Sequence, residues 1–487
     1  MYDVTVTKVN EAFIKLECER STSQEISDYF TFQVPGYQFV PAYRNKLWDG
    51  KIRLFDLKTN QIYYGLVPYI KKFCSDRKYS VTFDKNVELE ENFSLKEAEE
   101  FISTLNIPFQ PKDYQKVAFV QAIRSRRILL LSPTASGKSF IQYLIVRYIQ
   151  QQCNKGLLIV PTTSLVEQMY TDFKSYGYDV ESFCHRQYSG KEKHTNKFLT
   201  ITTWQSIYNL DKSYFEQFDF VLGDEAHQFK AKSLATIMTG LLNARYRIGC
   251  TGTLDGTKTH KLVLEGLFGP TFKVTTTKEL IDNKVLSDFK IKCLILKYPE
   301  DICQQSRKWD YQKEIEYIVM NAHRNNFIKN LVLSLQGNSL VLFQFVEKQG
   351  KQLFNIIETE AKDRKVFFIY GGTEVDTRES IRAITEKQND AIIIASYGTF
   401  STGINIRNLH NVIFASPSKS RIRNLQSIGR GLRKGDNKEV ATLFDIADDL
   451  RVGKHTNFTL NHFIERVKIY DEEKFNYKFY NIELKHG

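Results

Sequence analysis

The chain of 487 residues has few cysteines and no long apolar run. Its seven cysteines are scattered and never spaced CxxC, which argues against a disulfide scaffold or a zinc ribbon and favours a reducing environment. No stretch approaches the roughly 18 apolar residues of a membrane span, and the first residues lack the basic and apolar parts of a signal peptide. We therefore expect a cytoplasmic protein with no membrane partner.

Composition and charge narrow the function further. Hydrophobic residues make up 42% and charged residues 25% of the chain, which is typical of globular proteins and excludes wholesale disorder. At about 150 residues per domain, the length predicts roughly three domains. The formal net charge of +12 favours a polyanionic partner without identifying it.

The order of strand-like and helix-like segments divides the chain into four regions. Residues 1–105 alternate short strands with turns and are expected to form a small α+β domain. Apolar strands alternate with helices over 106–285 and again over 286–450, which is typical of parallel sheets covered on both faces. The tail, 451–487, contains one amphipathic helix candidate and is expected to be a helical C-terminal extension. The expected fold class is therefore α/β, with two tandem parallel-sheet domains.

The expected apolar strands of the two central regions fall in two series. They cover residues 128–131, 156–160, 199–202, 220–223 and 247–250, and then 339–343, 366–369, 391–395, 411–414 and 441–444.

The first motif with chemical meaning is a loop between the strand at 128–131 and the next expected helix. It reads SPTASGKS over residues 132–139. Backbone N–H groups of such a loop can surround a β-phosphate, and the helix N-terminus adds its positive dipole end. Lys138 would reach the β- and γ-phosphates, and the Ser139 hydroxyl would ligate Mg²⁺. A simple turn before a helix is the alternative reading.

A pair of carboxylates forms the second motif. Asp224 and Glu225 follow the apolar strand 220–223 directly. Two carboxylates at the end of a buried strand are costly unless a cation lies beside them. We expect Asp224 to hold Mg²⁺, directly or through water, and Glu225 to orient or deprotonate the attacking water. A solvated loop is the commoner setting for such a pair, but the apolar strand argues against it.

The third motif lies in the second parallel-sheet region. Gln426, Arg430 and Arg433 recur at i, i+4 and i+7, so on a helix they share one face. Guanidinium groups there can neutralise a γ-phosphate as an arginine finger does. The alternative is a solvated basic face.

The ordered set of motifs resembles that of a superfamily 2 helicase. Tyr114-Gln115 precedes the loop, and the further matching segments are 132–139 (motif I), 161–165 (Ia), 202–206, 224–227 (II), 251–253 (III), 401–405 (V) and 426–433 (VI). The loop departs from the usual PTGSGKT, because Ala135 replaces a glycine and Ser139 replaces threonine. Alanine predicts a negative φ at that position.

This resemblance implies RecA-like domains that use ATP and Mg²⁺. The catalytic residues that it implies are Lys138, Asp224, Glu225, Gln426, Arg430 and Arg433. The nucleotide contacts that it implies are Gln115, Thr134, Ala135, Ser136, Gly137, Lys138, Ser139, Gly403, Asn405, Arg430 and Arg433. The DNA contacts expected in the two sheet domains are Thr162, Thr163, Thr203, Trp204 and Thr402.

The ends of the chain carry a more specific resemblance. The segments 36–39, 48–54 and 470–477 resemble the UvsW helicase family of T4-type phages. The resemblance implies an ATP-dependent DNA helicase for branched DNA that migrates Holliday junctions, regresses forks and unwinds R-loops in recombination, repair and replication. The implied partners are branched, forked and single-stranded DNA and RNA–DNA hybrids. We expect a monomeric or weakly associating protein in the cytoplasm of the host cell.

The N-terminal region also has a local basic excess. Positions 40–78 contain nine basic and three acidic residues. Cations contact phosphates, and aromatic rings can stack on unpaired bases. We expect Arg44, Lys51 and Arg53 to contact DNA, whereas most of the interleaved rings are expected to form the core of the domain. These rings are Tyr37, Phe39, Tyr43, Trp48, Tyr63 and Tyr64.

Three alternative functions stay open at this point. An RNA or RNA–DNA hybrid helicase would use the same motor, because phosphate contacts do not separate the two nucleic acids. A DNA-binding or strand-annealing protein with a vestigial ATPase is opposed by the intact Lys138, Asp224 and Glu225. A nucleotide kinase or GTPase would leave the second sheet region and the arginines unexplained.

Overall fold

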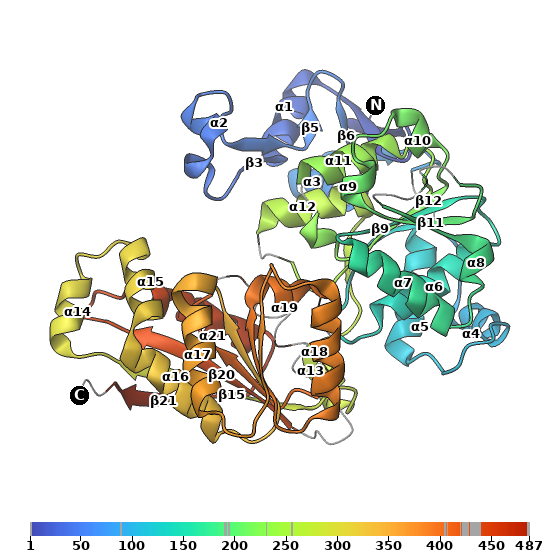
Figure 1. Cartoon of the computed structure of the whole chain (residues 1–487). Coiled ribbons are helices and arrows are strands. Elements are labelled where there is room, and N and C mark those ends of the chain that lie inside the picture. Colours follow the sequence, from blue (N-terminus) through green and yellow to red (C-terminus); the bar gives the residue numbers. More distant parts are fainter. Residues whose placement is uncertain are drawn as a thin grey trace. The chain divides into compact units, whose positions relative to one another are not determined.

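The computed structural model divides the chain into two compact units (Figure 1). Unit 1 comprises residues 1–132 and 137–275, and unit 2 comprises residues 133–136 and 276–487. The residues that the structure describes are 2–87, 90–188, 192, 195–229, 231–254, 257–403, 406, 408–418, 420, 428 and 440–484. Within them no helix is both long and apolar enough to cross a membrane.

The N-terminal region forms a five-stranded mixed sheet, so the expected small α+β domain is confirmed. The strand order is β5-β6-β2-β1-β7, with β1 and β7 parallel and the other pairs antiparallel. Its elements are β1 (Val4–Lys8), β2 (Phe13–Cys18), α1 (Arg20–Tyr29), β5 (Phe55–Asp56), β6 (Gln61–Tyr63), α3 (Val67–Arg77) and β7 (Val81–Phe83). Two further strands, β3 (Thr31–Gln33) and β4 (Lys51–Arg53), pair with each other and carry a loop between them.

The central sheet of unit 1 has seven parallel strands in the order β10-β11-β9-β12-β13-β8-β14. Its strands are β8 (Arg127–Leu131), β9 (Gly156–Val160), β10 (Cys184–Gln187), β11 (Leu199–Thr203), β12 (Phe220–Gly223), β13 (Tyr246–Thr251) and β14 (Thr271–Lys273). Its helices are α4 (Leu95–Ser103), α5 (Asp113–Ser125), α6 (Lys138–Ile149), α7 (Thr163–Ser175), α8 (Val180–Phe183), α9 (Trp204–Ile207), α10 (Lys212–Glu216), α11 (Ala231–Gly240) and α12 (Lys258–Phe268).

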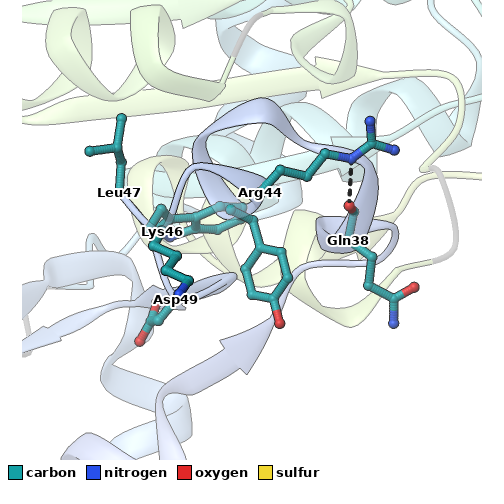
Figure 2. A pocket seen from close by; sticks show the side chains of 7 residues that line it. Gln38, Arg44, Lys46, Leu47 and Asp49 are labelled. Carbon is teal, nitrogen blue, oxygen red and sulfur yellow. Dashed lines mark hydrogen bonds between the residues drawn. The ribbon is translucent and has the colours of Figure 1, made fainter.

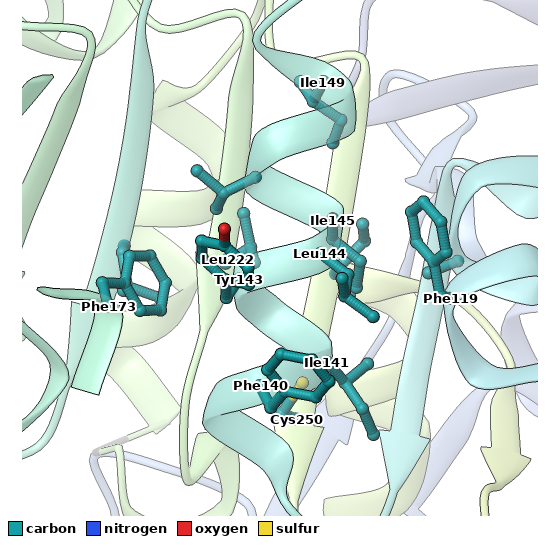
Figure 3. Packing of buried hydrophobic residues seen from close by; sticks show 14 of the residues in the cluster. Phe119, Phe140, Ile141, Tyr143, Leu144, Ile145, Ile149, Phe173, Leu222 and Cys250 are labelled. Atoms are coloured by element: carbon teal, nitrogen blue, oxygen red, sulfur yellow. The ribbon is translucent and has the colours of Figure 1, made fainter. Parts of the chain in front are cut away.

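Helix α6 is largely apolar because most of its length is enclosed, and every residue from Phe140 to Val146 is buried. Phe140, Ile141 and Leu144 are at most 2% exposed, and they belong to one cluster with residues of α5, α7 and the sheet (Figure 3). A helix that is hydrophobic all round is stable only when buried in this way. The helix that begins at Lys138 is therefore fixed by packing along its length.

The N-terminal domain shares its core with one face of this sheet. Leu66 and Ile70 belong to the same apolar cluster as Leu129 of β8 and residues of α12. A side-chain carbon added at Gly65 would lie 2.0 Å from the carbonyl oxygen of Glu265, so only glycine allows this approach. Glu11 forms an ion pair with Arg127, the first residue of β8. The N-terminal domain is therefore anchored to the strand that leads into the 132–139 loop.

Unit 2 contains a second sheet of seven parallel strands, in the order β17-β18-β16-β19-β20-β15-β21. Its strands are β15 (Asp288–Lys297), β16 (Ser339–Phe343), β17 (Val366–Ile369), β18 (Ile392–Ser396), β19 (Asn411–Phe414), β20 (Val440–Asp449) and β21 (Tyr477–Glu483). Its helices are α13 (Thr277–Asp282), α14 (Glu300–Ser306), α15 (Tyr311–Met320), α16 (Ala322–Ser334), α17 (Lys351–Glu360), α18 (Val375–Lys387), α19 (Tyr397–Gly403) and α21 (Phe458–Glu472).

The two parallel sheets confirm the expected α/β fold class with tandem RecA-like domains. All ten apolar strands expected from the sequence are present. The tail contains the expected helix, α21, and in addition the strand β21, which pairs with β15 at the edge of the sheet. The extension therefore completes the sheet of unit 2 rather than standing apart from it.

A buried ion pair fastens α21 to this sheet. Arg466 of α21 and Asp445 of β20 are at most 1% exposed, and Arg466 Nη2 lies 2.7 Å from Asp445 Oδ1. The same guanidinium donates through Nη1 to the carbonyl oxygen of Ser418 at 3.0 Å, and Tyr470 donates to Asp445 Oδ2 at 2.7 Å. Each polar group of the cluster is thus satisfied inside the unit.

Removing one member of this pair should be strongly destabilising. In Arg466→Leu the Asp445 carboxylate stays buried without its cation, which costs about 3–5 kcal/mol. We expect a lower urea midpoint for the unfolding transition of unit 2, followed by near-UV circular dichroism. Lys468→Gln on the same helix is the control, since Lys468 and its partner Glu465 are largely exposed and such pairs contribute under about 1 kcal/mol. Equal midpoints for the two variants would contradict the role given to Arg466.

Candidate nucleotide site

The 132–139 loop lies at the carboxyl edge of the unit 1 sheet. It follows β8, whose neighbour β13 ends at Thr251, and the next strand, β12, ends at Gly223 just before Asp224. Because the carboxyl ends of parallel strands meet at one edge, the three expected motifs of this unit come together there. Ligands of open α/β sheets bind at this edge.

The loop contains two residues with positive φ. Gly137 has φ 81° and Ala135 has φ 67°. The expectation that alanine holds φ negative at position 135 is therefore wrong. A non-glycine residue in this region costs on the order of 1–3 kcal/mol and persists where the surroundings impose it. Here Ser136 donates to the carbonyl oxygen of Pro133 through both its backbone N–H, at 3.3 Å, and its hydroxyl, at 2.7 Å.

Gln115 lies against this loop from the first turn of α5. Its side chain is 7% exposed, and its Oε1 accepts from the backbone N–H of Lys112 at 2.9 Å. Its Nε2 would lie 2.4 Å from a side-chain carbon at Gly137. Position 137 thus requires glycine, both for its backbone conformation and for lack of space. Gln115, one of the expected nucleotide contacts, lies at the loop.

Lys138 and Glu225 form the central ion pair of the site. Lys138 Nζ lies 3.2 Å from Glu225 Oε1 and 3.4 Å from the carbonyl oxygen of Ser132. Burial by itself raises the pKa of Glu225, but Lys138 and His227 outweigh it and hold the pKa below its ordinary value. Glu225 is therefore an ionised carboxylate at neutral pH.

Asp224 has the opposite protonation behaviour. Burial, and next the charge of Glu225, raise its pKa from 3.8 to about 7. Its Oδ1 accepts from Gln142 Nε2 at 2.9 Å. Gln142, one turn after Lys138 on α6, was missed by the sequence analysis, although the i+4 spacing places it on the same helix face. The two carboxylates thus differ: one is ionised, and the other is close to its titration point at neutral pH.

Contacts of His227 connect Glu225 to the end of β13. His227 Nδ1 lies 3.4 Å from Glu225 Oε2 and 2.5 Å from the hydroxyl oxygen of Thr251. Thr251 donates to the carbonyl oxygen of Thr253 at 2.9 Å, so it accepts from His227, whose Nδ1 carries the proton. Glu225 itself has φ 47°, a strained value for glutamate. Motifs II and III are therefore joined by direct contacts.

The hydroxyl of Ser139 is engaged by Tyr176, another residue that the sequence analysis missed. The two hydroxyl oxygens are 2.8 Å apart. Burial raises the pKa of Tyr176 to about 12, so its phenol is neutral. Its ring packs on Phe140, with ring centroids 5.1 Å apart, and next to Phe109. Ser139 is thus held at the start of α6 by a contact that a ligand can replace.

The polar groups at the loop fit Mg²⁺ held with a nucleotide. Among the residues that the structure describes, no group of three His, Cys, Asp or Glu side chains forms a metal cluster. Mg²⁺ usually takes one or two protein oxygens and completes its shell with water and phosphates. Ser139 and Asp224 supply such oxygens. Gln142 Oε1 is buried beside Asp224 and has no hydrogen-bond partner among those residues.

Several expected site residues lie outside the described part of the chain. These are Asn405, Gln426, Arg430 and Arg433, and the side chain of Thr402 is not described either. Gly403 is the last residue of α19. Their roles stay predictions.

The expected DNA contacts of unit 1 differ in exposure. Thr163 is exposed at the start of α7, and the hydroxyl of Thr162 caps that helix by accepting from the N–H of Leu165 at 3.4 Å. Thr203 is buried, with its hydroxyl 2.8 Å from that of Ser206. Trp204 is 9% exposed, so its ring serves the core.

Comparison with known proteins places the chain in a family. Residues 3–84 match the profile of the N-terminal domain of DNA helicase UvsW, residues 108–256 that of the type III restriction enzyme res subunit, and residues 323–435 that of the helicase conserved C-terminal domain. The ATP-dependent DNA helicase uvsW of Enterobacteria phage T4 is 35% identical to this chain, with 99% of the chain and all of the relative covered. The chain belongs to the UvsW helicase family.

Solved structures agree with this assignment. The crystal structure of T4 UvsW has a TM-score of 0.53 at 34% identity, covering 99% of this chain and 100% of that one. The DNA-bound type ISP restriction-modification enzyme LlaBIII has a TM-score of 0.57 at 16% identity, over 84% of this chain and 34% of that one, and shows the fold alone. The resemblance inferred from the motifs is therefore confirmed.

The raised pKa of Asp224 predicts how stability depends on pH. Between pH 3.8 and about 7 the folded chain binds more protons at this carboxyl than the unfolded chain does. The stabilising contribution of the protonated form is therefore complete below about pH 4 and is lost as the pH rises through 7. Between about pH 5 and pH 8 the free energy of unfolding of the wild type should therefore fall. In Asp224→Asn, which has no carboxyl group to titrate at this position, the fall should be smaller by on the order of 1–3 kcal/mol.

The measurement is urea unfolding of the nucleotide-free proteins across that pH range. Asp211→Asn is the matched control, because Asp211 is exposed, and its pH dependence should equal that of the wild type. If Asp224→Asn keeps the wild-type slope, Asp224 is not the group that titrates near neutrality.

Proposed function

We propose that the chain is an ATP-dependent DNA helicase that remodels branched DNA. The observation that carries the proposal is the pairing of Lys138 with Glu225 at the loop, beside the buried Asp224, in a chain of the UvsW family. The T4 relative of nearly equal extent is described as an ATP-dependent DNA helicase. To the present chain we assign the migration of Holliday junctions, fork regression and R-loop unwinding, in recombination, repair and replication.

The residues at the loop have separate tasks in this proposal. The triphosphate of ATP draws Lys138 from Glu225, and the backbone of residues 134–137 surrounds the phosphates. Glu225, ionised and no longer paired, orients the attacking water and accepts its proton. Ser139 and Asp224 would hold Mg²⁺, which would supply positive charge beside the phosphate oxygens. Arg430 and Arg433 neutralise the charge that develops on the γ-phosphate.

DNA is held chiefly by its phosphates, so the contacts are independent of sequence. We assign Arg44 and Lys51 of the N-terminal domain and Thr162 and Thr163 at the start of α7 to these contacts, together with Thr203 and Thr402. Arg53 is engaged in an ion pair with Asp49, and the ring of Trp204 is buried, so both are weaker candidates. The cysteines of the described residues are free thiols, which agrees with the reducing cytoplasm of a host cell.

An RNA or RNA–DNA hybrid helicase is the second candidate, because the loop chemistry is indifferent to the nucleic acid. A strand-annealing protein with a vestigial ATPase is opposed by the Lys138–Glu225 distance of 3.2 Å and by the differing pKa values of the two carboxylates. The decisive comparison is ATPase and unwinding, measured side by side on single-stranded DNA, forked DNA, four-way junctions and RNA–DNA hybrids.

Lys138→Ala should abolish the motor and leave DNA binding. Loss of the cation that neutralises the phosphates should lower ATP hydrolysis at least about 100-fold, and junction migration should fall to background. Lys174→Ala is the control, because Lys174 is exposed on α7 and only loosely paired with Glu181. A Lys138→Ala variant that migrates junctions at the full rate would refute the proposal.

Arg430→Ala should lower kcat far more than it changes KM for ATP. An arginine that stabilises the transition state contributes roughly 1,000-fold or more to kcat. Lys438→Ala, in the same basic segment, is the control and should retain activity. A raised KM with unchanged kcat would show that Arg430 binds the ground state and the transition state equally and does not act specifically on the transition state.

A further inference from the structure

The loop between β3 and β4 forms a small lobe, residues 34–50, that stands to one side of α1 and β5 (Figure 1). It contains a 3₁₀ turn, Tyr37–Phe39, and the short helix α2 (Pro41–Arg44). Its ends are closed by a hydrogen bond from Val34 N–H to the carbonyl oxygen of Gly50 at 2.9 Å. Within these residues, all of which the structure describes, only Gly50 is buried.

Two rings hold the lobe together without forming a core. Tyr37 packs edge-on against Tyr43 with ring centroids 4.6 Å apart. A side-chain carbon at Gly50, which has φ 78°, would lie 2.5 Å from the Tyr37 ring. Trp48 Nε1 donates to the carbonyl oxygen of Lys51 at 2.8 Å. The shape of the lobe is thus fixed by Tyr37, Tyr43 and Trp48.

Two apolar side chains take no part in this packing. Phe39 is 73% exposed and Leu47 is 81% exposed, the highest values among the large apolar side chains of the described residues. Both belong to the same lobe. The sequence predicted that most of the six rings of this region lie in the core. This is wrong for most of them: Tyr64 is buried and Tyr63 packs against the core, but Phe39 is exposed and the other three rings are half-buried in the lobe.

The lobe and its neck are strongly cationic. Residues 33–53 carry Arg44, Lys46, Lys51 and Arg53 against a single acid, Asp49. Asp49 is engaged with Arg53, which holds the pKa of Asp49 at about 2. Among the described residues no carboxylate lies within ion-pairing distance of Arg44, Lys46 or Lys51. A surface that combines unpaired cations with exposed apolar groups suits a polyanion that also presents flat apolar faces.

A pocket of about 590 Å³ opens on this surface (Figure 2). Its walls include Tyr43, Leu47 and Trp48, together with Arg44 and Lys46. Figure 2 shows Arg44 reaching over the carbonyl of Gln38, to which its Nε donates at 3.2 Å. The pocket is open to solvent, and its lining offers rings for a base and cations for phosphates, beside the carboxylate of Asp49.

We propose that this lobe binds an unpaired nucleotide at the branch point of DNA. The base enters the pocket against Leu47 and Trp48, and Arg44 and Lys46 contact the flanking phosphates. Phe39 covers a neighbouring base. The proposal rests on the helicase function proposed above and assigns a substrate-recognition site to it.

An unpaired nucleotide fits better than intact duplex for a physical reason. A duplex buries its base faces by stacking and presents phosphates and groove edges. These provide little apolar surface for Leu47 and Phe39 to contact. Unpaired bases expose their faces, and stacking on protein side chains contributes roughly 1–3 kcal/mol per base. Apolar wedges of this kind also insert where base steps open. Branch points are where paired and unpaired nucleotides meet.

The test compares single-site variants of the full-length protein. Leu47→Ala truncates an 81% exposed side chain, so folding should be unaffected. Leu57→Ala, in the same domain but outside the lobe and 45% exposed, is the matched control. Affinity is measured by fluorescence anisotropy on a fork with unpaired arms and on a blunt duplex of the same length. We expect Leu47→Ala to weaken fork binding about tenfold and duplex binding less than about twofold, with Leu57→Ala equal to the wild type.

The cations give a second, independent readout. Lys46→Gln should weaken binding to both DNAs and lower the slope of log affinity against log salt by about 1, as expected for one lost phosphate contact. Lys58→Gln, outside the lobe, should leave that slope unchanged.

Unchanged fork affinity in Leu47→Ala would overturn the proposal and leave the lobe as a surface for another protein. Equal losses on fork and duplex would also overturn it, because the site would then not read unpaired nucleotides. This failure is distinct from failure of the proposed function. If wild-type protein does not remodel forks with ATP, the helicase function is wrong. If it does so and Leu47→Ala matches it in fork binding, only the lobe assignment is wrong.

Discussion

Two adjacent carboxylates at the end of a buried strand are the constraint around which unit 1 is organised. Charges in such a place are tolerated only when a cation or a proton offsets them. The chain uses both, with Lys138 offsetting Glu225 and a proton near neutral pH offsetting Asp224. In the proposed function Lys138 leaves Glu225 for the triphosphate, and Mg²⁺ would replace the proton of Asp224, so the cost of burying the two carboxylates would favour binding of the nucleotide with its metal.

The contacts around Glu225 distribute this site over several strands. Lys138 follows β8, Glu225 follows β12, and Thr251, which His227 contacts, ends β13. Since these strands pair in the sheet, the loop, the acids and the threonine are held in one frame. Glu225, His227 and Thr251 are thus linked by side chains that are in contact. Glu225 has a strained φ of 47°, and its carboxylate is paired with Lys138 of the loop.

The sequence predicted the parts that depend on local pattern. Runs such as 156–160 and 392–396 lie in buried strands because an apolar run of that length has few other stable positions, and the loop and the acids follow from motif chemistry. Other features depend on contacts distant in sequence, and no local pattern showed them. These are the Tyr176 contact with Ser139, the positive φ of Ala135 and the packing of the N-terminal domain on α12. Strand β21 gave a weak signal, because it is an edge strand with mostly exposed side chains.

The close contact between Gly65 and Glu265 has a consequence for the architecture of this family. The N-terminal domain covers apolar residues of α12 and pairs Glu11 with the first residue of the strand that leads into the nucleotide loop. The N-terminal domain therefore cannot be transferred by itself to another helicase motor. A chimaera that grafts it onto another motor would have to carry α12 and Arg127 with it, or it would expose an apolar face and leave the Glu11 carboxylate without the Arg127 guanidinium.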